Sequence, residues 1–452
     1  MRLRKTITTI VATAILLAGW QLFAVIANQP ELIPSLPRLV RTLCEWLVSS
    51  SFYQSVGATI LRGVLGMSIS FVCAIGMAGL FARFEWVYEL FRPLLAIMRS
   101  IPVISFILLA LIFLNPESIP LMIAFLTMFP LLTENLTRGI LDLRPGLSIM
   151  ARQFHIRRSN VLFQIIYPQL KPFLYSGLAS ATGFGWRAII MGEVLSQCAF
   201  GIGSEMKRAQ NFIAVPELLA WTIVAVFISF FFDKGISKVA DITPKISFAN
   251  EDQTIPTPTL SVLDTKDISY QYGIQHFSHS FQKGIIYGIS APSGKGKTTL
   301  LNLIGGILLP TEGEIHPTRH FGIATIFQQP QLLPHLTAEE NIILPLSSFL
   351  TEEKARRIAQ KHLQEMEMEP FGNRYPKELS YGQQQRIAIA RALAYPSPLL
   401  LMDEPFKGLD EALSHRIIER IREKQMKEER IILFTSHNPD EIRLLADEVI
   451  YL

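Results

Sequence analysis

A glycine-rich loop between two apolar segments is the part of the sequence best suited to bind phosphate. Residues 285–290 read as a buried strand, residues 291–299 as the turn Ala-Pro-Ser-Gly-Lys-Gly-Lys-Thr-Thr, and residues 298–307 as a helix. Glycines let backbone N–H groups approach phosphate oxygens closely, and a helix N-terminus favours negative charge. Lys297 would contact the β- and γ-phosphates, and the Thr298 hydroxyl would bind Mg²⁺. The loop therefore predicts a nucleotide site.

Two carboxylates follow a second buried strand further along the chain. The apolar run of residues 399–402 ends in Asp403 and Glu404. The carboxyl ends of parallel strands meet at one edge of a sheet, so both side chains are expected beside the phosphate loop. Asp403 would hold Mg²⁺ directly or through water, and Glu404 would polarise the attacking water. Together, the loop and the carboxylates predict a Mg²⁺ and water site beside a bound phosphate group.

Further motifs, in a fixed order, resemble those of ABC transporter ATPases. Residues 379–392 are closely similar to the signature motif and signature helix of that family, with Tyr381 in place of a glycine. The other motifs are a Q-loop (327–334), a Walker B and D-loop segment (403–410) and a switch-histidine segment (435–437). The resemblance covers about residues 260–452.

The resemblance implies a role for each motif. In the family, ATP lies between the phosphate loop of one ATPase copy and the signature motif of another, so Lys297 and Ser380 of two chains would share a nucleotide. The implied catalytic residues are Glu404, His437 and Gln328; the Mg²⁺ ligands are Thr298, Gln328 and Asp403; and the nucleotide-binding residues are Tyr272, Ser293, Gly294, Lys295, Gly296, Lys297, Thr298, Thr299, Ser380, Gly382 and Gln383.

Helix geometry and side-chain chemistry support some of these assignments. Ser380 and Gly382 open a helix, so their N–H groups and the helix dipole can face a γ-phosphate. Tyr272 would stack on adenine, or it is an ordinary strand tyrosine. His437, after the expected strand 431–434, would contact the γ-phosphate, or it is a surface histidine. Gln328 would sense the nucleotide and couple it to the first half of the chain.

The composition places a second, very different region before these motifs. Of the 452 residues, 49% are hydrophobic and only 18% are charged, and the mean hydropathy is +0.31. These values exclude a disordered chain and a nucleic-acid-coating tail, and they indicate membrane segments. The cysteines, Cys44, Cys73 and Cys198, are far apart, which predicts free thiols rather than a disulfide scaffold or a zinc site. We expect a transmembrane permease domain over 1–242, a linker over 243–259, and an ABC ATPase domain over 260–452.

Six apolar stretches are long enough, or nearly so, to cross a bilayer as helices. They cover residues 7–27, 60–82, 94–114, 118–135, 173–197 and 216–233. Lys and Arg are concentrated before the first stretch and after the second, fourth and sixth, which predicts a cytoplasmic N-terminus. The chain would then re-enter the cytoplasm, where ATP is available. A cleaved signal peptide is the alternative for the first stretch, and it would place the second half on the wrong side.

The membrane half resembles the permease subunits of binding-protein-dependent ABC importers, most closely the nitrate, sulfonate and taurine group. The likeness is carried by residues 32–37, 90–93, 99–102, 150–155, 166–168, 172 and 177–178. The segment 150–168 resembles the cytoplasmic coupling loop that docks on the ATPase, although His155 stands where the family usually has glycine. A generic basic loop on the cytoplasmic side is the alternative.

Ionisable side chains within a membrane span usually face a cavity or a partner. Arg187 and Glu193 lie within the fifth predicted span. Arg187 would meet an anionic substrate, pair with a carboxylate, or lie near the membrane interface. Glu134, near the end of the fourth span, is expected to make a contact on the cytoplasmic side.

These patterns support one hypothesis for the whole chain. It is a multi-domain protein, with an all-α six-helix transmembrane domain followed by an α/β P-loop ABC ATPase domain. With ATP and Mg²⁺ it would import a small anionic or organic solute across the bacterial inner membrane by alternating access. The expected partners are a second copy of the chain, a periplasmic or lipid-tethered solute-binding protein, the small-molecule substrate and the lipid bilayer, and no nucleic acid.

Two alternatives remain at the level of the sequence. An ABC exporter would normally have longer helices that reach into the cytoplasm, and the short loops disfavour it. A membrane regulatory component with a weakened ATPase is the other alternative, since Ala291, Tyr381 and His155 each replace a family glycine. The intact phosphate-loop lysine and Walker B carboxylates favour an active enzyme.

Overall fold

The computed structural model describes residues 2–240, 244–253, 260–271, 273–292, 294–317 and 322–452. The chain forms two compact units. The first unit comprises Met1–Leu143 and Gln169–Thr243, and the second comprises Arg144–Pro168 and Pro244–Leu452. The second unit therefore includes a short segment from the first half of the sequence. The domain boundaries expected at residues 242 and 260 remain predictions.

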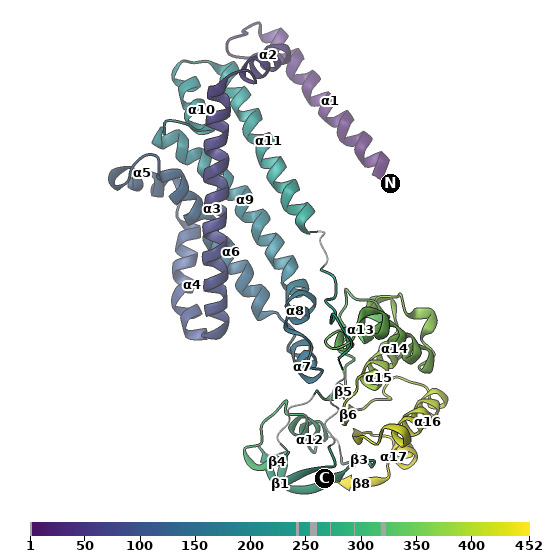
Figure 1. The fold of residues 1–452 in the computed structure, drawn as a ribbon. Coiled ribbons are helices and arrows are strands. Elements are labelled where there is room, and N and C mark those ends of the chain that lie inside the picture. The colour runs from purple at the N-terminus through teal and green to yellow at the C-terminus, as the bar shows by residue number, and fades with distance from the viewer. Residues whose placement is uncertain (1, 241–243, 254–259, 272, 293, 318–321) are drawn as a thin grey trace. The chain divides into compact units, whose positions relative to one another are not determined.

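The described part of the first unit is helical (Figure 1). Its helices are α1 (Arg2–Ala27), α2 (Leu36–Trp46), α3 (Ser50–Arg83), α4 (Glu85–Ser100), α5 (Val103–Phe113), α6 (Ile119–Leu141), α9 (Tyr167–Ser196), α10 (Ile202–Asn211) and α11 (Val215–Ala240). Helices overlap all six stretches predicted to cross a bilayer. The described helices outnumber the six expected, because short helices such as α2 and α10 lie between the long ones.

The third predicted span, residues 94–114, is not one helix. It is divided between α4 and α5, which meet at an angle of 94°. Ile101 at the break is extended, with φ −71° and ψ 130°. Proline excludes the helical conformation from the residue before it and lacks an N–H group, so Pro102 explains the break.

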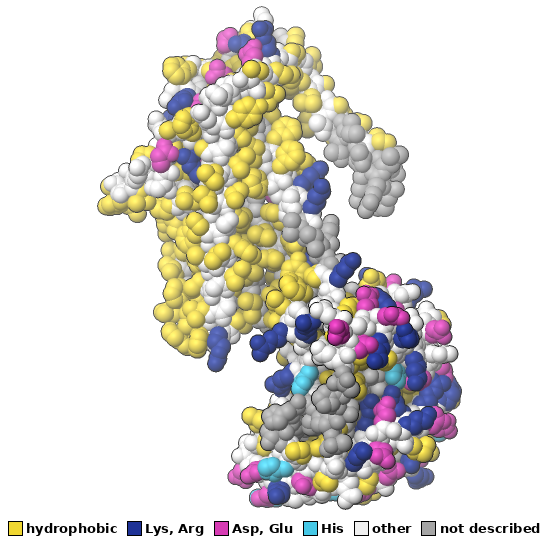
Figure 2. All heavy atoms as spheres, in the orientation of Figure 1, with side chains coloured by type: hydrophobic (Ala, Val, Ile, Leu, Met, Phe, Trp, Pro, Cys, Tyr) yellow, Lys and Arg dark blue, Asp and Glu magenta, His cyan; other side chains and the backbone are white. Residues whose placement is uncertain are grey.

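By length and apolar composition alone, the described residues contain three helices able to cross a membrane, or up to four if the bent pair counts as one span. The three are α3, α6 and, within α11, Val215–Ile236. Figure 2 shows hydrophobic side chains over most of the visible face of this unit, whereas the second unit carries mixed charges. An apolar outer surface of this kind suits a helix bundle surrounded by lipid.

Small residues allow the long helices to pack closely. A Cβ atom on Gly66 of α3 would lie 2.6 Å from the Cβ of Ala124 in α6, and one on Gly185 of α9 would lie 2.1 Å from Met128 Cε. Close backbone approach at glycine and alanine is typical of helices that pack within a membrane. These contacts hold α3, α6 and α9 side by side.

The second unit contains two sheets. The antiparallel sheet has the order β2 (Ile274–Gln282), β1 (Val262–Tyr270), β4 (Glu312–His316), and the parallel sheet has the order β5 (Ala324–Ile326), β6 (Leu399–Asp403), β7 (Ile431–Thr435), β3 (Ile286–Ser290), β8 (Glu448–Tyr451). In the parallel sheet, β7 lies between β6 and β3. Thr435 pairs with Ile289 on one side and with Asp403 on the other, so the carboxyl ends of the three strands meet at one edge.

Helices complete the second unit. They are α7 (Pro145–Gln153), α8 (Arg158–Asn160), the π-helix η1 (Val161–Ile166), α12 (Lys297–Ile304), α13 (Ala338–Leu346), α14 (Glu352–Glu365), the 3₁₀ helices η2 (Glu369–Phe371) and η3 (Pro376–Glu378), α15 (Tyr381–Ala394), α16 (Glu411–Glu428) and α17 (Pro439–Leu445). The helix predicted over 298–307 is α12, which ends earlier because Gly305 and Gly306 follow it, the latter with φ 66°.

Residues 144–168, which include the segment 150–168 predicted to act as a coupling loop, pack within the second unit. Phe154 is fully buried, and its ring centroid lies 5.2 Å from that of Tyr395. The backbone of Gln153 accepts a hydrogen bond from Ile323 N at 2.7 Å, and its side chain donates to Gly305 O at 2.8 Å. This segment thereby contacts the residue that ends α12.

His155 follows Phe154 and has a left-handed backbone, with φ 46°. Only glycine adopts this region without steric cost. A histidine at this position therefore carries local backbone strain that a glycine would not have.

The described residues of the predicted linker, 244–253, belong to the second unit and form hydrogen bonds within it. Ala249 N donates to Ser347 O at 3.0 Å, and Gln253 N donates to Phe349 O at 2.8 Å. Asn160 joins the two segments, since its side chain bonds both the backbone of Ser247 and the hydroxyl of Ser347. The described part of the linker is therefore bound along the second unit. Residues 243 and 254–259 lie outside the described residues.

Candidate active site

The phosphate loop leads from β3 into α12. Gly294 and Gly296 have φ values of 81° and 89°, which L-residues with side chains rarely adopt. Gly296 is needed for a second reason, since a Cβ atom there would lie 2.7 Å from Gly273 O. Lys297 begins α12, is 7% exposed, and donates from Nζ to Ala291 O at 2.8 Å. The Lys297 side chain thus lies against the phosphate loop, to which it is hydrogen-bonded.

The other residues predicted to bind the nucleotide make fewer contacts or lie outside the described residues. Lys295 N donates to Pro292 O at 3.3 Å, and its side chain is exposed. Thr299 Oγ1 lies 4.0 Å from the position that a Cβ atom on Gly273 would occupy. Ser293 and Tyr272, expected to bind phosphate and adenine, lie outside the described residues, so their roles remain predictions.

Asp403 lies at the end of β6, directly beside α12. Its carboxylate accepts a hydrogen bond from the Thr298 hydroxyl at 2.9 Å and another from the Thr435 hydroxyl at 2.8 Å. Burial raises the pKa of Asp403, and the neighbouring charge of Glu404 raises it further, while the hydroxyl donors act in the opposite direction. The structure therefore brings together Thr298 and Asp403, two of the three expected Mg²⁺ ligands.

Glu404 is the centre of a cluster of polar side chains. Its backbone has φ 48°, and its N–H donates to the Thr435 hydroxyl at 3.0 Å. One carboxylate oxygen lies 3.1 Å from Nε2 of His437, and the other lies 3.2 Å from Nζ of Lys407. The Gln328 side chain also hydrogen-bonds to this carboxylate. Glu404 therefore contacts both of the other residues predicted to be catalytic, His437 and Gln328.

The surroundings of Glu404 decide its charge. Burial alone would raise the pKa of its carboxyl, but the hydrogen bond and charge of Lys407, the hydrogen bond of Gln328 and the charge of His437 outweigh burial. The net effect lowers the pKa, so the group is a carboxylate at neutral pH. A carboxylate is the form needed to orient or accept a proton from an attacking water.

Sequence reasoning missed Lys407. It lies three residues after Glu404 in the predicted Walker B and D-loop segment. Its spacing alone did not distinguish a partner of Glu404 from a solvated surface lysine. The turn that follows β6, in which Lys407 N donates to Glu404 O at 3.2 Å, brings the ammonium group back to the carboxylate.

The signature residues meet at the start of α15. Ser380 is the N-cap, and its Oγ accepts from Gln383 N at 3.3 Å while Gln383 Oε1 accepts from Ser380 N at 2.9 Å. A Cβ atom on Gly382 would lie 2.6 Å from Gly408 O. Reciprocal capping of this kind fixes the helix N-terminus, where backbone N–H groups favour an anion. Among the described residues, no hydrogen bond joins these three to the phosphate loop.

The expected Mg²⁺ ligands have the donor chemistry that this ion requires. A threonine hydroxyl, a carboxylate and an amide oxygen, from Thr298, Asp403 and Gln328, are the hard oxygen donors that Mg²⁺ prefers. The described residues contain no group of three or more His, Cys, Asp or Glu able to hold a metal. The set therefore fits an ion whose remaining ligands are phosphate oxygens and water.

The ionisable side chains of the predicted membrane spans differ in burial and in their partners. Glu193 is fully buried and accepts hydrogen bonds from Thr59, Arg62 and Gly203 at 2.8 to 3.0 Å. Glu134 pairs with both Arg99 and Arg138. Arg187 is exposed on α9 and has no hydrogen bond or ion pair with any residue that the structure describes. Its expected contact with a substrate remains a prediction.

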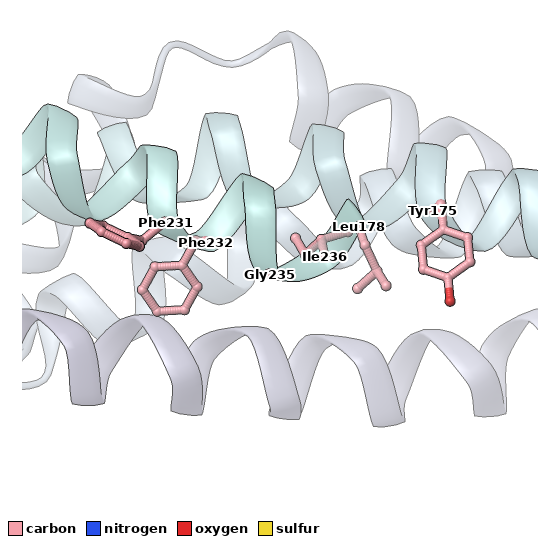
Figure 3. Close-up of a pocket in the computed structure, with 6 residues that line it drawn as sticks. All are labelled: Tyr175, Leu178, Phe231, Phe232, Gly235 and Ile236. Atoms are coloured by element: carbon pink, nitrogen blue, oxygen red, sulfur yellow. The ribbon is translucent and has the colours of Figure 1, made fainter. Parts of the chain in front are cut away.

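An apolar cavity of about 440 Å³ lies in the first unit. Figure 3 shows that its lining comes from α9 and α11, with three aromatic rings among the labelled side chains. The lining residues are Tyr175, Leu178, Phe231, Phe232, Gly235 and Ile236. The cavity provides an apolar surface, and neither Arg187 nor Glu193 contributes to its lining.

Comparison with known proteins identifies two family matches. Residues 274–407 match the family described as "ABC transporter", and residues 67–233 match "Binding-protein-dependent transport system inner membrane component". The thiamine import ATP-binding protein ThiQ of Yersinia pseudotuberculosis is 34% identical over 205 residues, which are 42% of this chain and 86% of that protein. An uncharacterized ABC transporter ATP-binding protein of Methanocaldococcus jannaschii is 34% identical over 201 residues, which are 40% of this chain and 85% of that protein.

Other similar proteins extend well beyond the region that they share with this chain. The Fe(3+) ions import ATP-binding protein FbpC of Rhizobium etli is 35% identical over 189 residues, 40% of this chain and 54% of that protein. The chain spans about half the length of this relative. Among solved structures, a dimeric ATP-binding cassette bound to ADP and phosphate has 32% identity and a TM-score of 0.40, and covers 42% of this chain and 94% of its own.

Proposed function

Since this chain belongs to the ABC transporter family, with a permease region and an ATPase region joined in one polypeptide, we propose that it hydrolyses ATP to import a small solute across a membrane. The observation that carries the proposal is the cluster around Glu404. A charged carboxylate in contact with His437 and Gln328 lies beside Asp403 and the phosphate loop. This arrangement can hold a triphosphate and orient a water molecule in line with it.

Each part of the site has a proposed task. Lys297 and the N–H groups of the loop hold the β- and γ-phosphates. Glu404 orients the attacking water and receives its proton, His437 contacts the γ-phosphate, and Gln328 responds to the nucleotide. Thr298, Asp403 and Gln328 would hold Mg²⁺, which neutralises phosphate charge when bound.

We propose that the working unit is a homodimer. Ser380, Gly382 and Gln383 form their own N-terminal anion site on α15, without a hydrogen bond to the phosphate loop among the described residues. A second chain would bring its α15 to the nucleotide held by Lys297. The bacterial inner membrane, with the N-terminus and the ATPase region in the cytoplasm, is the proposed location, and the charge distribution of the loops supports it.

The ATPase region does not identify the solute. Similar proteins are named for the import of iron, thiamine and glucose. The resemblance of the permease region to the nitrate, sulfonate and taurine group favours a small anionic or organic solute. A separate periplasmic or lipid-tethered solute-binding protein would deliver it, as the match to a binding-protein-dependent permease family suggests.

Hydrolysis is tested by measuring phosphate release from the full chain in lipid nanodiscs, beside Glu404→Gln. The matched control is Glu419→Gln, which alters an exposed glutamate of α16. We expect the Glu404 variant to lose about a hundredfold or more of the rate, because general base assistance has that scale, and the control to keep it. No hydrolysis by the intact chain, with ATP binding retained, would instead favour a regulatory component.

The homodimer is tested by mixing two inactive variants. Lys297→Ala chains and Ser380→Arg chains should each be inactive. A mixed dimer contains one site in which both residues are intact, so mixing should restore a fraction of the rate. If mixing restores nothing while the mixed dimers are shown to form, each chain uses its own signature residues and the shared site is wrong. Stimulation of hydrolysis by a solute-binding protein would favour import over export.

A further inference from the structure

Tyr381 is the residue at which the signature motif departs from glycine, and its side chain makes specific contacts. Its hydroxyl donates to Gln328 O at 2.8 Å. A Cβ atom on Gly408 would lie 2.7 Å from Tyr381 Cδ1, so the ring occupies the space above that glycine. Gly408 also has a φ of 79°, which only glycine adopts readily. The tyrosine therefore contacts two loops that a glycine at position 381 could not reach.

Both of these loops lead to Glu404. Gln328 bonds to Tyr381 through its carbonyl oxygen and to Glu404 through its side chain. Lys407, which precedes Gly408, forms an ion pair with the same carboxylate at 3.2 Å. Tyr381 thus contacts the Q-loop and the D-loop segment immediately behind the residues that surround the candidate base. Its own position is next to Ser380, the N-cap of α15.

A second side chain of α15 holds the same loop. Arg391 is 1% exposed, and it donates to Pro330 O and Gln331 O at 2.8 Å each. Its guanidinium carbon lies 5.4 Å from the ring centroid of Phe154, in the segment predicted as the coupling loop. The Q-loop is therefore attached to α15 at a buried end by Arg391 and at a more exposed end by Tyr381, which is 42% exposed.

We propose that Tyr381 is a positioning residue that links the signature helix of a chain to that chain's own Q-loop. Nucleotide bound at one phosphate loop would move Gln328, and the hydroxyl of Tyr381 would pass this movement to Ser380. Ser380 would contact the ATP that is held by the phosphate loop of the other chain, so the link makes ATP binding at the two nucleotide sites cooperative. The inference rests on the proposed homodimer, and it adds a residue outside the reacting groups, because the Tyr381 hydroxyl donates to the backbone oxygen of Gln328 and not to the side chains around Glu404 that the structure describes.

The size of the effect follows from the strength of one hydrogen bond. A neutral hydrogen bond contributes enough to change an equilibrium about two- to tenfold. Tyr381→Phe removes the hydroxyl and keeps the ring on Gly408. We therefore expect the half-saturating ATP concentration to rise about two- to tenfold and the Hill coefficient for ATP to fall toward one. The rate at saturating ATP should stay within about twofold, because the groups around Glu404 remain.

The experiment measures hydrolysis against ATP concentration for the full chain in nanodiscs. Tyr381→Phe is compared with Tyr381→Gly, which restores the family motif, and with Tyr451→Phe. Tyr451 is 79% exposed, and its hydroxyl has no hydrogen bond to a described residue, so its variant controls for loss of a phenolic hydroxyl. A thermal unfolding midpoint equal to that of the intact chain excludes a folding defect. Unchanged half-saturation and Hill coefficient in both Tyr381 variants would overturn the proposal.

A binding measurement separates this inference from the proposed function. Titration of a fluorescent ATP analogue is carried out in the Glu404→Gln background, with and without Tyr381→Phe. We expect cooperative binding only when Tyr381 is intact. If the intact chain does not hydrolyse ATP, the proposed function is wrong. The titration of the ATP analogue still shows whether Tyr381 makes binding at the two sites cooperative. If hydrolysis depends on Glu404 and both titrations are identical, the function stands and the link is wrong.

Discussion

Nε2 of His437 lies 3.1 Å from Oε1 of Glu404. The two residues come from different strands, since Glu404 follows β6 and His437 follows β7. Parallel pairing of these strands places Asp403 opposite Thr435, and one hydroxyl, that of Thr435, bonds to Asp403 and to the N–H of Glu404. The distance between the candidate base and the histidine is therefore set by the strand register and by a bridging threonine.

Lys407→Met should move the acid limb of the hydrolysis pH profile to higher pH. Lys407 supplies the largest of the effects that lower the pKa of Glu404, so its removal lets burial raise that pKa. The base is then protonated, and inactive, over a wider range at low pH. The measurement is kcat against pH, with Lys427→Met on the solvated end of α16 as the control. An acid limb that does not move would show that Glu404 does not govern it.

His362 should make the second unit less stable in mild acid. Its side chain is 4% exposed, and burial together with the charges of Lys424, Lys361 and Arg430 lowers its pKa from 6.5 to about 3. Between pH 6.5 and about 3, His362 is protonated in the unfolded state and neutral in the folded state. The free energy of unfolding that is present above pH 6.5 is therefore lost as the pH falls toward 3. Between pH 7.5 and 5.5 the loss is about 1.4 kcal/mol.

Unfolding midpoints of the full chain at the two pH values measure this effect. His362→Gln should remove part of the pH dependence, whereas His415→Gln, which alters an exposed histidine of α16, should not. A pH dependence that is the same in the intact chain and in the His362 variant would contradict the assignment.

Glu193→Ala should destabilise the helical unit by about 3 to 5 kcal/mol, the effect of removing one partner of a buried ion pair. The substitution removes the buried acceptor of the Gly203 N–H and of Arg62, which keeps its bonds to Glu117 and to Phe200 O. Thermal unfolding in lipid, read from intrinsic fluorescence, measures the loss. Glu217→Ala, at an exposed position in the first turn of α11, is the matched control. Equal midpoints for the two variants would be inconsistent with a structural role for Glu193.

His155→Gly should leave the fold intact and raise its stability by about 0.5 to 1 kcal/mol, since glycine adopts a left-handed backbone without strain. His155 has a φ of 46° and an exposed side chain. His155→Ala is the comparison, because alanine retains the Cβ atom and the strain. A glycine variant less stable than the alanine variant would show that backbone strain is not what the histidine introduces.

Much of this protein could be predicted from the sequence because its signals are local. The six apolar stretches predicted helices, and the loop of residues 291–299 predicted the turn between β3 and α12. The predicted carboxylates Asp403 and Glu404 lie at the end of β6 as expected. Hydrophobic periodicity, glycine content and strand ends depend on neighbouring residues, so the amino-acid order is sufficient to predict them.

Other features were decided only by the tertiary structure. Pro102 in the sequence predicts a break, but the 94° angle between α4 and α5 cannot be read from it. Lys407 became a partner of Glu404 through the turn after β6, and Arg62 reached Glu193 across 131 positions of sequence. In the sequence, Tyr381 is only a departure from the glycine of the signature motif. The hydrogen bond from its hydroxyl to Gln328 O appears only in the folded chain. The contacts of Arg62 with Glu193 and of Tyr381 with Gln328 join residues far apart in the chain, and their geometry exists only when the elements that carry them have packed. The contact of Lys407 with Glu404 joins residues three positions apart and depends on the turn after β6.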